Sequence, residues 1–225
     1  MLKKLVPGVL VMCLLPSLAQ GSLRLSDFFI DLHPERRAGA LFAKNEGSEA
    51  LYLKIDVVEV LDPTEADSDV RRVDDPRELG LLVSPQRLVL QPGEEGRIRA
   101  LALTDPDGDR FYKVSVVPVA GTLNTETPVG IKVMIGYSAW VYVRPEGAKP
   151  ELKGVRKGNS LTLTNTGDTL AQLVMGKQCT AVRQCEQIQP MRVLAGRRKH
   201  VELPFVDGSA TFRMVWGDQS QDLMF

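Results

Sequence analysis

The sequence has little histidine, little cysteine and no net charge. Its 225 residues include two histidines and three cysteines, and 28 basic residues balance 28 acidic ones. The scarcity of histidine and cysteine disfavours a multi-ligand zinc site. Because the charges are interspersed rather than clustered, no basic groove for nucleic acid is expected. Beyond the N-terminus no apolar run reaches the roughly 20 residues that span a membrane.

Motifs of the common enzyme classes are also missing. The sequence contains no Walker loop, no dinucleotide fingerprint, no G-x-S-x-G and no histidine-rich metal motif. His33 and His200 are isolated in the sequence, and we expect both at the surface. We predict that the protein is not an enzyme and has no cofactor or metal, with a glycosidase of unusual sequence as the remaining catalytic alternative.

The N-terminus has the layout of a secretory signal peptide. Lys3 and Lys4 precede a short apolar run, and small residues follow it. Cleavage after Ala19 or Gly21 fits these small residues, and we favour Gly21, which makes residues 1–21 the signal peptide. Cys13 lies inside the apolar run without the small residues that precede a lipidated cysteine. We therefore predict an exported, slightly acidic protein that does not insert into the membrane.

Two cysteines remain after this processing, Cys179 and Cys185. An even pair in an exported chain is most simply a disulfide. Zinc is the alternative, but the sequence has no second cysteine or histidine pair at ligand spacing. We predict a disulfide that closes a local loop.

The remaining sequence is all-β in character. Short apolar segments alternate with turn residues, no stretch of a dozen residues has a clean helical period, and no internal repeat of fixed period is visible. Residues 62–76 are expected to form an acidic loop, and residues 146–150 a hinge between two domains, 22–145 and 146–225. The expected strands are residues 28–32, 38–45, 51–61, 81–84, 87–90, 96–103, 111–118, 129–143, 160–164, 170–177, 191–193, 200–203, 210–216 and 223–225, with one more near Val155.

The segment from Val129 to Val143 is the most informative of these. Every odd-numbered residue in it is apolar, which is the period-2 pattern of a strand with one apolar face. Fifteen residues exceed the usual strand length of about 3–10. Part of the apolar face therefore extends past its own sheet, and another protein chain is the candidate cover. The alternative is that all of these residues fill the protein's own core.

Aromatic residues cluster near this segment and near the C-terminus. Trp140 and Tyr142 lie on the even face of the long strand, and Phe212 and Trp216 lie near the end of the chain. Such side chains form either a carbohydrate-binding platform or part of a sandwich core, and we favour the core.

Several segments together resemble the periplasmic chaperones of the fimbrial chaperone/usher pathway. The block 80–93 (GLLVSPQRLVLQPG), followed by Arg97-Ile98-Arg99, resembles the proline, short strand, Pro-Gly turn and strand arginine of that family. Residues 111–118 resemble the next strand, and Tyr142-Val143-Arg144-Pro145 resembles the interdomain junction. The opening residues 27–32 and the Cys179/Cys185 pair are most similar to the alternate branch, which serves colonisation-factor-type fimbriae.

This resemblance implies two immunoglobulin-like β-sandwich domains at an angle. It implies a periplasmic chaperone that binds fimbrial subunits by donor-strand complementation and delivers them to an outer-membrane usher, with possible self-association when empty. On the family pattern the subunit-binding residues are Val129, Ile131, Val133 and Ile135. A structural fimbrial subunit or adhesin, and a carbohydrate-binding protein that uses Trp140 and Trp216, are the alternative functions.

One departure from the family pattern concerns the subunit's terminal carboxylate. Much of the family anchors it with an arginine and a lysine, but Phe29 and Trp140 occupy these positions here. Arg24, Lys132 and Arg144 are the candidate substitutes, and the alternative is an aromatic or backbone-only contact. On the pattern of relatives, Arg144 is instead expected to be an interdomain residue that pairs with Asp207.

Overall fold

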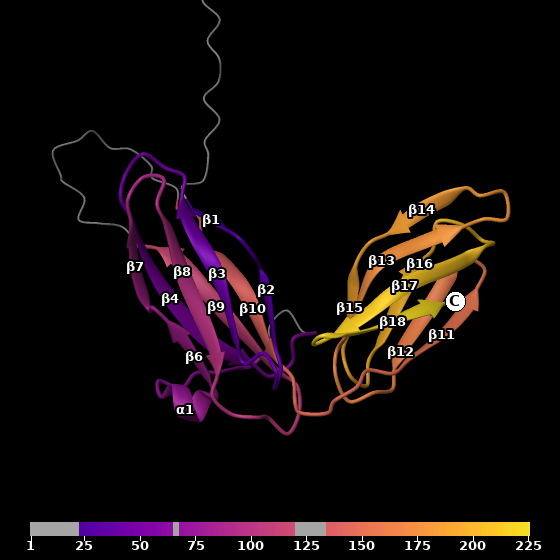
Figure 1. Cartoon of the computed structure of the whole chain (residues 1–225), viewed down its shortest axis with the longest axis horizontal. Coiled ribbons are helices and arrows are strands. Elements are labelled where there is room, and N and C mark those ends of the chain that lie inside the picture. The colour runs from indigo at the N-terminus through magenta and orange to yellow at the C-terminus, as the bar shows by residue number, and fades with distance from the viewer. Residues whose placement is uncertain (1–22, 65–67, 120–133) are drawn as a thin grey trace, which may run out of the picture.

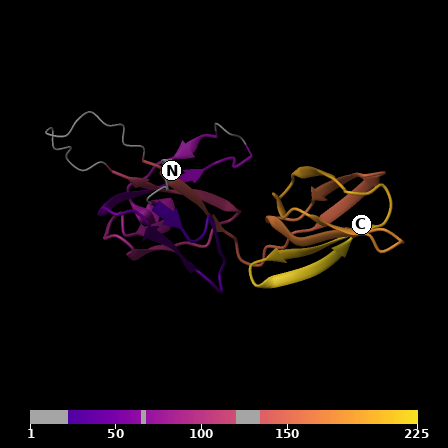
Figure 2. The ribbon, with the colours of Figure 1, turned by 90° about the horizontal axis from the view of Figure 1, so that it is seen from above.

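The computed structural model describes residues 23–64, 68–119 and 134–225. It consists of two β-sandwich lobes set at an angle, which meet at one end (Figure 1). Seen from above, the lobes remain separate layered bodies (Figure 2). The chain passes between them through residues 144–151. The predicted all-β class and pair of immunoglobulin-like sandwiches are confirmed. The predicted signal peptide, residues 1–21, lies outside the described residues.

Two sheets form the first lobe. One has the order β1-β3-β8-β6, and the other has the order β2-β10-β9-β4-β5, with β7 also paired to β4. The bounds are β1 Leu23–Leu25, β2 Phe29–Leu32, β3 Ala38–Asn45, β4 Leu51–Val60, β5 Val70–Arg71, α1 Pro76–Leu79, β6 Leu81–Ser84, β7 Arg87–Leu90, β8 Glu95–Ala102, β9 Arg110–Pro118 and β10 Tyr137–Val143.

The second lobe also has two sheets. Their orders are β11-β12-β16 and β14-β13-β17-β18, with β15 paired to β13. The bounds are β11 Leu152–Lys157, β12 Ser160–Asn165, β13 Ala171–Cys179, β14 Cys185–Ile188, β15 Met191–Val193, β16 Arg198–Glu202, β17 Ser209–Trp216 and β18 Gln219–Met224.

Each lobe has its own hydrophobic core, which follows from the alternation of the strand residues. In β4, Leu51, Leu53 and Ile55 are buried, whereas the side chains between them are exposed. In the second lobe, Leu161 and Leu163 of β12 pack in a cluster with Phe212 and Met214 of β17. Phe212 is buried in the core of the second lobe and Trp216 packs against it, as the core interpretation of the aromatic residues predicts. Tyr142 is also buried, but it lies where the lobes meet, with its hydroxyl on Thr169, and not in the core of the first lobe.

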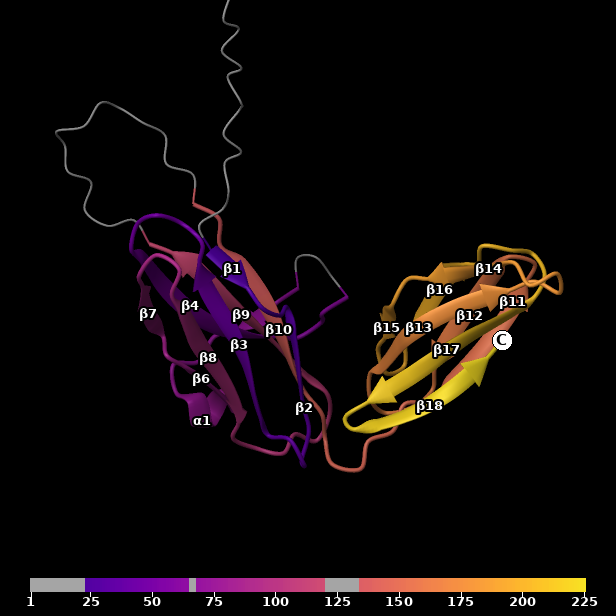
Figure 3. The same ribbon diagram turned by 45° about the horizontal axis from the view of Figure 1, so that its top comes forward.

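The N-terminal segment contributes to both sheets of the first lobe. β1 pairs antiparallel with β3, and after residues 26–28 the chain enters the other sheet as β2, which pairs parallel with β10. Figure 3 shows β2 and β10 side by side on the side of the first lobe that faces the second. Because β2 is only four residues long, it covers only part of the β10 edge.

The structure differs from the expected strands mainly at short elements. β1, β14 and the helix α1 were not predicted, and β5 lies inside the expected acidic loop. Among the described residues the long strand begins at Tyr137, not earlier. Its antiparallel ladder with β9 ends at the pair Tyr137 and Val116. The next hydrogen-bonded pair in this register would join Ile135 to Pro118, which lacks the backbone N–H that the pair needs.

No helix in the described part of the chain has the length and apolar character to cross a bilayer.

Candidate binding site

The apolar stripe of β10 passes from buried to exposed within a few residues. Ala139 and Val141 are 0% exposed and Val143 is 4% exposed, whereas Ile135 of the same stripe is 49% exposed. Tyr137, between them, is partly buried against the core. From Tyr137 to Val143 the stripe therefore packs in or against the core of the first lobe. Ile135, the stripe residue that precedes Tyr137, lies outside the core.

The backbone edge of β10 is open at the same place. Trp140 N donates to Phe28 O and Arg144 N donates to Leu32 O, both at 2.9 Å, so even-numbered residues direct their backbone groups toward β2. Backbone direction alternates along a strand, which places the N–H and C=O of Ser138 on this side too. The pairing with β2 begins only at Trp140, and no described strand covers the edge before it. An unpaired strand edge is a site where another strand can add.

Apolar side chains surround this open edge. Phe28 is 51% exposed, and its ring centroid lies 5.9 Å from that of Tyr137. Val117, on the neighbouring β9, is 45% exposed and lies next to Gly136, where an added Cβ would be 3.2 Å from Val117 Cγ2. Met134 is 40% exposed. The surface near the edge can thus bury apolar side chains of a partner strand as well as its backbone.

One of the four residues predicted to enter a partner, Ile135, lies within the described part of the chain. Ile135 is placed at the exposed end of the stripe. Val129, Ile131 and Val133 lie outside the described residues, so their role remains a prediction from the sequence.

The open edge leads to a cleft between the lobes. Phe29 and Trp140 are register partners on β2 and β10, and the rings of Phe111 and Tyr142 stack with their centroids 4.9 Å apart. From the second lobe, Arg192 places its Cζ 3.8 Å from the centroid of the Phe29 ring. The two positions where the family pattern expects basic residues are therefore adjacent and aromatic, and a cation lies over the ring of Phe29.

Arg192 is not among the site residues predicted from the sequence. It lies in β15, far along the chain from Phe29, and only the packing of the lobes brings the two together. The other candidates behave differently: Arg24 pairs with Glu46 at 2.8 Å in the opposite sheet, Arg144 is buried in an ion pair, and Lys132 lies outside the described residues.

Arg144 joins the two lobes at the end of β10. Its side chain is 3% exposed and its guanidinium binds both carboxylate oxygens of Asp31, with Nε 2.9 Å from Oδ1 and Nη2 2.9 Å from Oδ2. Its Nη1 donates to Thr169 Oγ1 and Leu170 O in the second lobe. The expected partner Asp207 is not the one that the structure shows, because the first lobe itself supplies a closer carboxylate on the strand next to β10. Asp207 instead accepts a hydrogen bond at its backbone oxygen from Gln178.

Asp109 extends this junction. Its carboxylate accepts hydrogen bonds from Thr169 Oγ1 at 2.8 Å and from the backbone N–H of Leu170 at 2.9 Å. Burial raises the pKa of the Asp109 carboxyl, although these hydrogen bonds and the charge of Arg144 act in the opposite direction. Burial likewise raises the pKa of the Tyr142 hydroxyl, which contacts Thr169.

We expect Asp109→Asn to gain stability relative to the wild type as the pH rises. A carboxyl whose pKa is raised by folding contributes most stability below its unfolded pKa of about 3.9, and that contribution is lost as the pH rises through the raised folded pKa. Asparagine cannot ionise, so the variant has no such loss of stability as the pH rises. Urea unfolding at several pH values between about 4 and 7 checks this, with the exposed Asp107→Asn as control. A pH-independent difference between Asp109→Asn and the wild type would contradict it.

His33 is also part of the junction, so the expectation that it lies at the surface is wrong. It is 5% exposed because the turn between β17 and β18 packs over it, with Gly217 next to its ring. Its Nδ1 lies 2.9 Å from Glu35 Oε2, and its Nε2 lies 3.4 Å from Asp218 Oδ1 of the second lobe. His200 is exposed, as expected.

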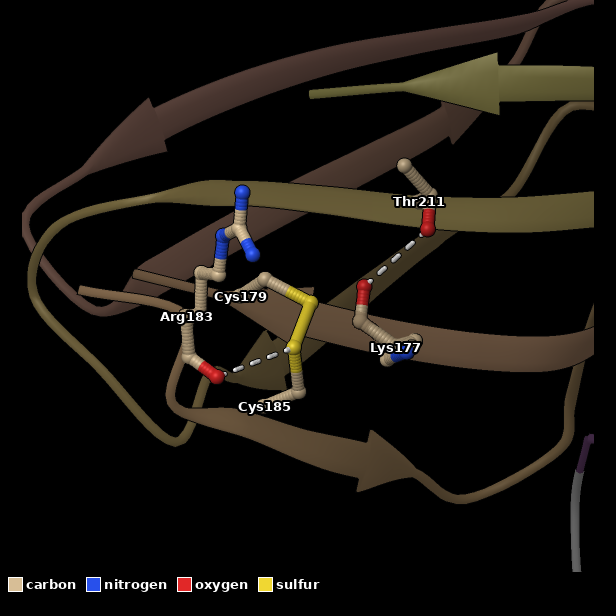
Figure 4. The surroundings of a disulfide bond; sticks show 5 residues. All are labelled: Lys177, Cys179, Arg183, Cys185 and Thr211. Carbon is tan, nitrogen blue, oxygen red and sulfur yellow. Dashed lines mark hydrogen bonds between the residues drawn. A yellow bond between two sulfur atoms is a disulfide. The ribbon is translucent and has the colours of Figure 1, made fainter. Parts of the chain in front are cut away.

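Cys179 and Cys185 form the predicted disulfide, with their Cα atoms 4.1 Å apart. They are register partners at the end of the β13 and β14 hairpin, and Figure 4 shows Arg183 and Lys177 beside the bond. The bond closes a hairpin at the far end of the second lobe from the junction (Figure 1), so its role is local. Among the described residues, no three His, Cys, Asp or Glu side chains are grouped to hold a metal ion.

No family model and no curated protein matches this sequence. Solved structures match nearly its whole length. The class 5 fimbriae chaperone CfaA is 16% identical with a TM-score of 0.59, covering 90% of this chain and 98% of the other. A chain in the complex of the Salmonella enterica SafA pilin with the SafB chaperone is 15% identical with a TM-score of 0.59, and the match covers 92% of this chain and 96% of the other. The Escherichia coli chaperone DraB is 14% identical with a TM-score of 0.58, and the match covers 91% of this chain and 96% of the other. This chain thus has the fold of these pilus chaperones.

Proposed function

We propose that the protein is a periplasmic chaperone that binds fimbrial subunits by donor-strand complementation and delivers them to an outer-membrane usher. One observation carries the proposal: the apolar stripe of β10 leaves the core at Tyr137, where the backbone edge of the strand is also open. A strand added there gains backbone hydrogen bonds and places alternate side chains against apolar surface. The shared fold with pilus chaperones supports this use of the edge.

The energetics suit a transient escort. A client that buries four side chains of the donor segment, Val129, Ile131, Val133 and Ile135, gains about 1.5–3 kcal/mol from each before ordering costs. Backbone pairing depends little on sequence, so one chaperone can accept several related subunits. The empty edge can also pair with a second copy of the chain, which is the self-association that the family resemblance allows for.

The alternative, a structural fimbrial subunit or adhesin, predicts a first sandwich that lacks its own last strand. β10 instead lies inside the sheet of the first lobe, between β2 and β9. This arrangement favours a protein that offers a strand over one that needs a strand.

The test is co-expression in the periplasm with candidate subunits encoded beside the gene. We expect the double variant Ile131→Asp and Val133→Asp to lose most of the copurified subunit, because two carboxylates cannot enter apolar pockets without large desolvation costs. The matched control is Val155→Asp with Val182→Asp, which changes two exposed valines of the second lobe. Wild-type recovery of subunit with the first variant would remove the support for strand donation.

A further inference from the structure

The cleft between the lobes has the composition of an anion-binding site. Its volume is about 440 Å³, its floor is formed by Phe29, Phe111 and Trp140 of the first lobe, and its wall includes Arg192, Arg198 and Lys199 of the second. Arg197, also in the wall, is paired with Asp62 at 2.9 Å. For Arg192, Arg198 and Lys199, no ion pair to a described residue is present.

Arg192 is the most constrained of these cations. Its guanidinium lies on the face of Phe29 and makes no hydrogen bond to any residue in the described ranges. Partial burial against the aromatic floor lowers the pKa of Arg192. The nearest acidic charge is Asp31, but both of its oxygens already bind Arg144. A partly desolvated guanidinium with unused donors is stabilised by an anion, and its planar fork matches a carboxylate.

The position of the cleft defines where that carboxylate comes from. β2 occupies the β10 edge from Trp140 onward, so a strand that adds to the open edge must end where β2 begins, at Phe28 and Phe29. Phe29 lines the cleft. A C-terminal carboxylate is favoured beside the cationic wall, whereas an N-terminal ammonium is repelled.

We infer that Arg192 binds the C-terminal carboxylate of a strand added to β10, in a site built from the aromatic floor of one lobe and the basic wall of the other. The inference rests on the proposed function. It assigns the carboxylate contact to the second lobe, in place of the basic pair that Phe29 and Trp140 displace in the first. Because both lobes contribute, an occupied site also holds the lobes in one relative position.

The test measures the preference for a free carboxylate. Two synthetic peptides of about eight alternating valines and threonines, behind two N-terminal lysines, differ only in ending in a carboxylate or an amide. Isothermal titration calorimetry with the full mature chain should give about tenfold tighter binding of the carboxylate peptide, the scale of one charge-assisted hydrogen-bonded contact. Arg192→Gln should reduce this ratio to about one, and Arg192→Lys should retain part of it.

The control variant is Arg99→Gln, which removes an exposed arginine from the opposite sheet and should keep the wild-type ratio. The ratio compares two ligands on the same protein, so a general loss of stability does not mimic the effect. Equal binding of both peptides to the wild type, or an unchanged ratio in Arg192→Gln, overturns the role of Arg192 while leaving strand binding intact. Failure of both peptides to bind the wild type counts against the proposed function itself.

Discussion

Replacing Arg144 with alanine should lower the free energy of unfolding by about 3–5 kcal/mol and release the lobes from their fixed angle. The cost is large because the substitution leaves the Asp31 carboxylate, only 15% exposed, without its bidentate partner. It also removes the donors to Thr169 Oγ1 and Leu170 O, and the guanidinium 4.5 Å above the Tyr142 ring. Both lobes contact this buried cation, so they lose a common anchor when it is removed.

Urea unfolding and small-angle X-ray scattering check this expectation. The control is Arg213→Ala, because Arg213 also binds both oxygens of an aspartate, Asp222, but at the exposed surface of one lobe. Exposed pairs contribute little, so this variant should unfold and scatter like the wild type. An unchanged unfolding midpoint and scattering profile in Arg144→Ala would refute the role of Arg144 as the anchor.

The second large effect is expected at two buried asparagines, Asn45 and Asn165. Asn165 is 0% exposed, and its Nδ2 donates to Thr169 O at 2.8 Å and Val193 O at 2.9 Å. Its Oδ1 accepts from the backbone N–H of Gly167 at 3.0 Å. Asn165→Ala leaves these backbone groups unsatisfied, at about 1–3 kcal/mol for each buried group, so we expect a loss of about 3 kcal/mol or more.

Asn45 makes the same contacts in the first lobe. Its Nδ2 donates to Glu49 O at 2.7 Å and Leu90 O at 3.0 Å, and its Oδ1 accepts from Gly47 N at 3.0 Å. Each asparagine ends a strand and accepts at its backbone oxygen from a glycine, Gly93 in one lobe and Gly196 in the other. Asn45→Ala should therefore cost a similar amount, in the first lobe.

Denaturant unfolding of each variant measures the two losses. The exposed Asn159→Ala is the control, because its side chain makes no hydrogen bond to another described residue. If either buried asparagine can be replaced by alanine with as little effect as Asn159, its side-chain hydrogen bonds do not contribute to the free energy of unfolding as expected.

The strand pattern was predictable because alternation is local information. Leu51, Leu53 and Ile55 are recognisable from the sequence as one face of a strand, and so is the stripe that ends at Val143. The start of β10 was not predictable from its own residues, because it depends on where the neighbouring strand β9 ends. Pro118, at the end of β9, terminates the ladder between the two strands. The short β1 and β5 exist only through pairing and carry no period long enough to recognise.

The residues of the site depend still more on tertiary packing. Arg144 was identified as a junction residue, but Asp31 was not identified as its partner, because only the parallel pairing of β2 with β10 brings them together. Arg192 reaches Phe29 across the lobes. The equivalent contacts of Asn45 and Asn165 form a structural repeat that a search for a fixed sequence period misses. Leu90 lies 45 residues after Asn45, whereas Val193 lies 28 residues after Asn165.

The geometry of β10 also limits how the gene can vary in length. Ile135 precedes the strand at its exposed end and Arg144 follows it at the junction, with Ala139 and Val141 buried between them. Inserting or deleting one codon between residues 135 and 144 would exchange the inward and outward faces on one side of the change. Either the edge would present polar side chains, or the guanidinium would move away from Asp31. Length changes are therefore expected in surface turns of this protein and not within this strand.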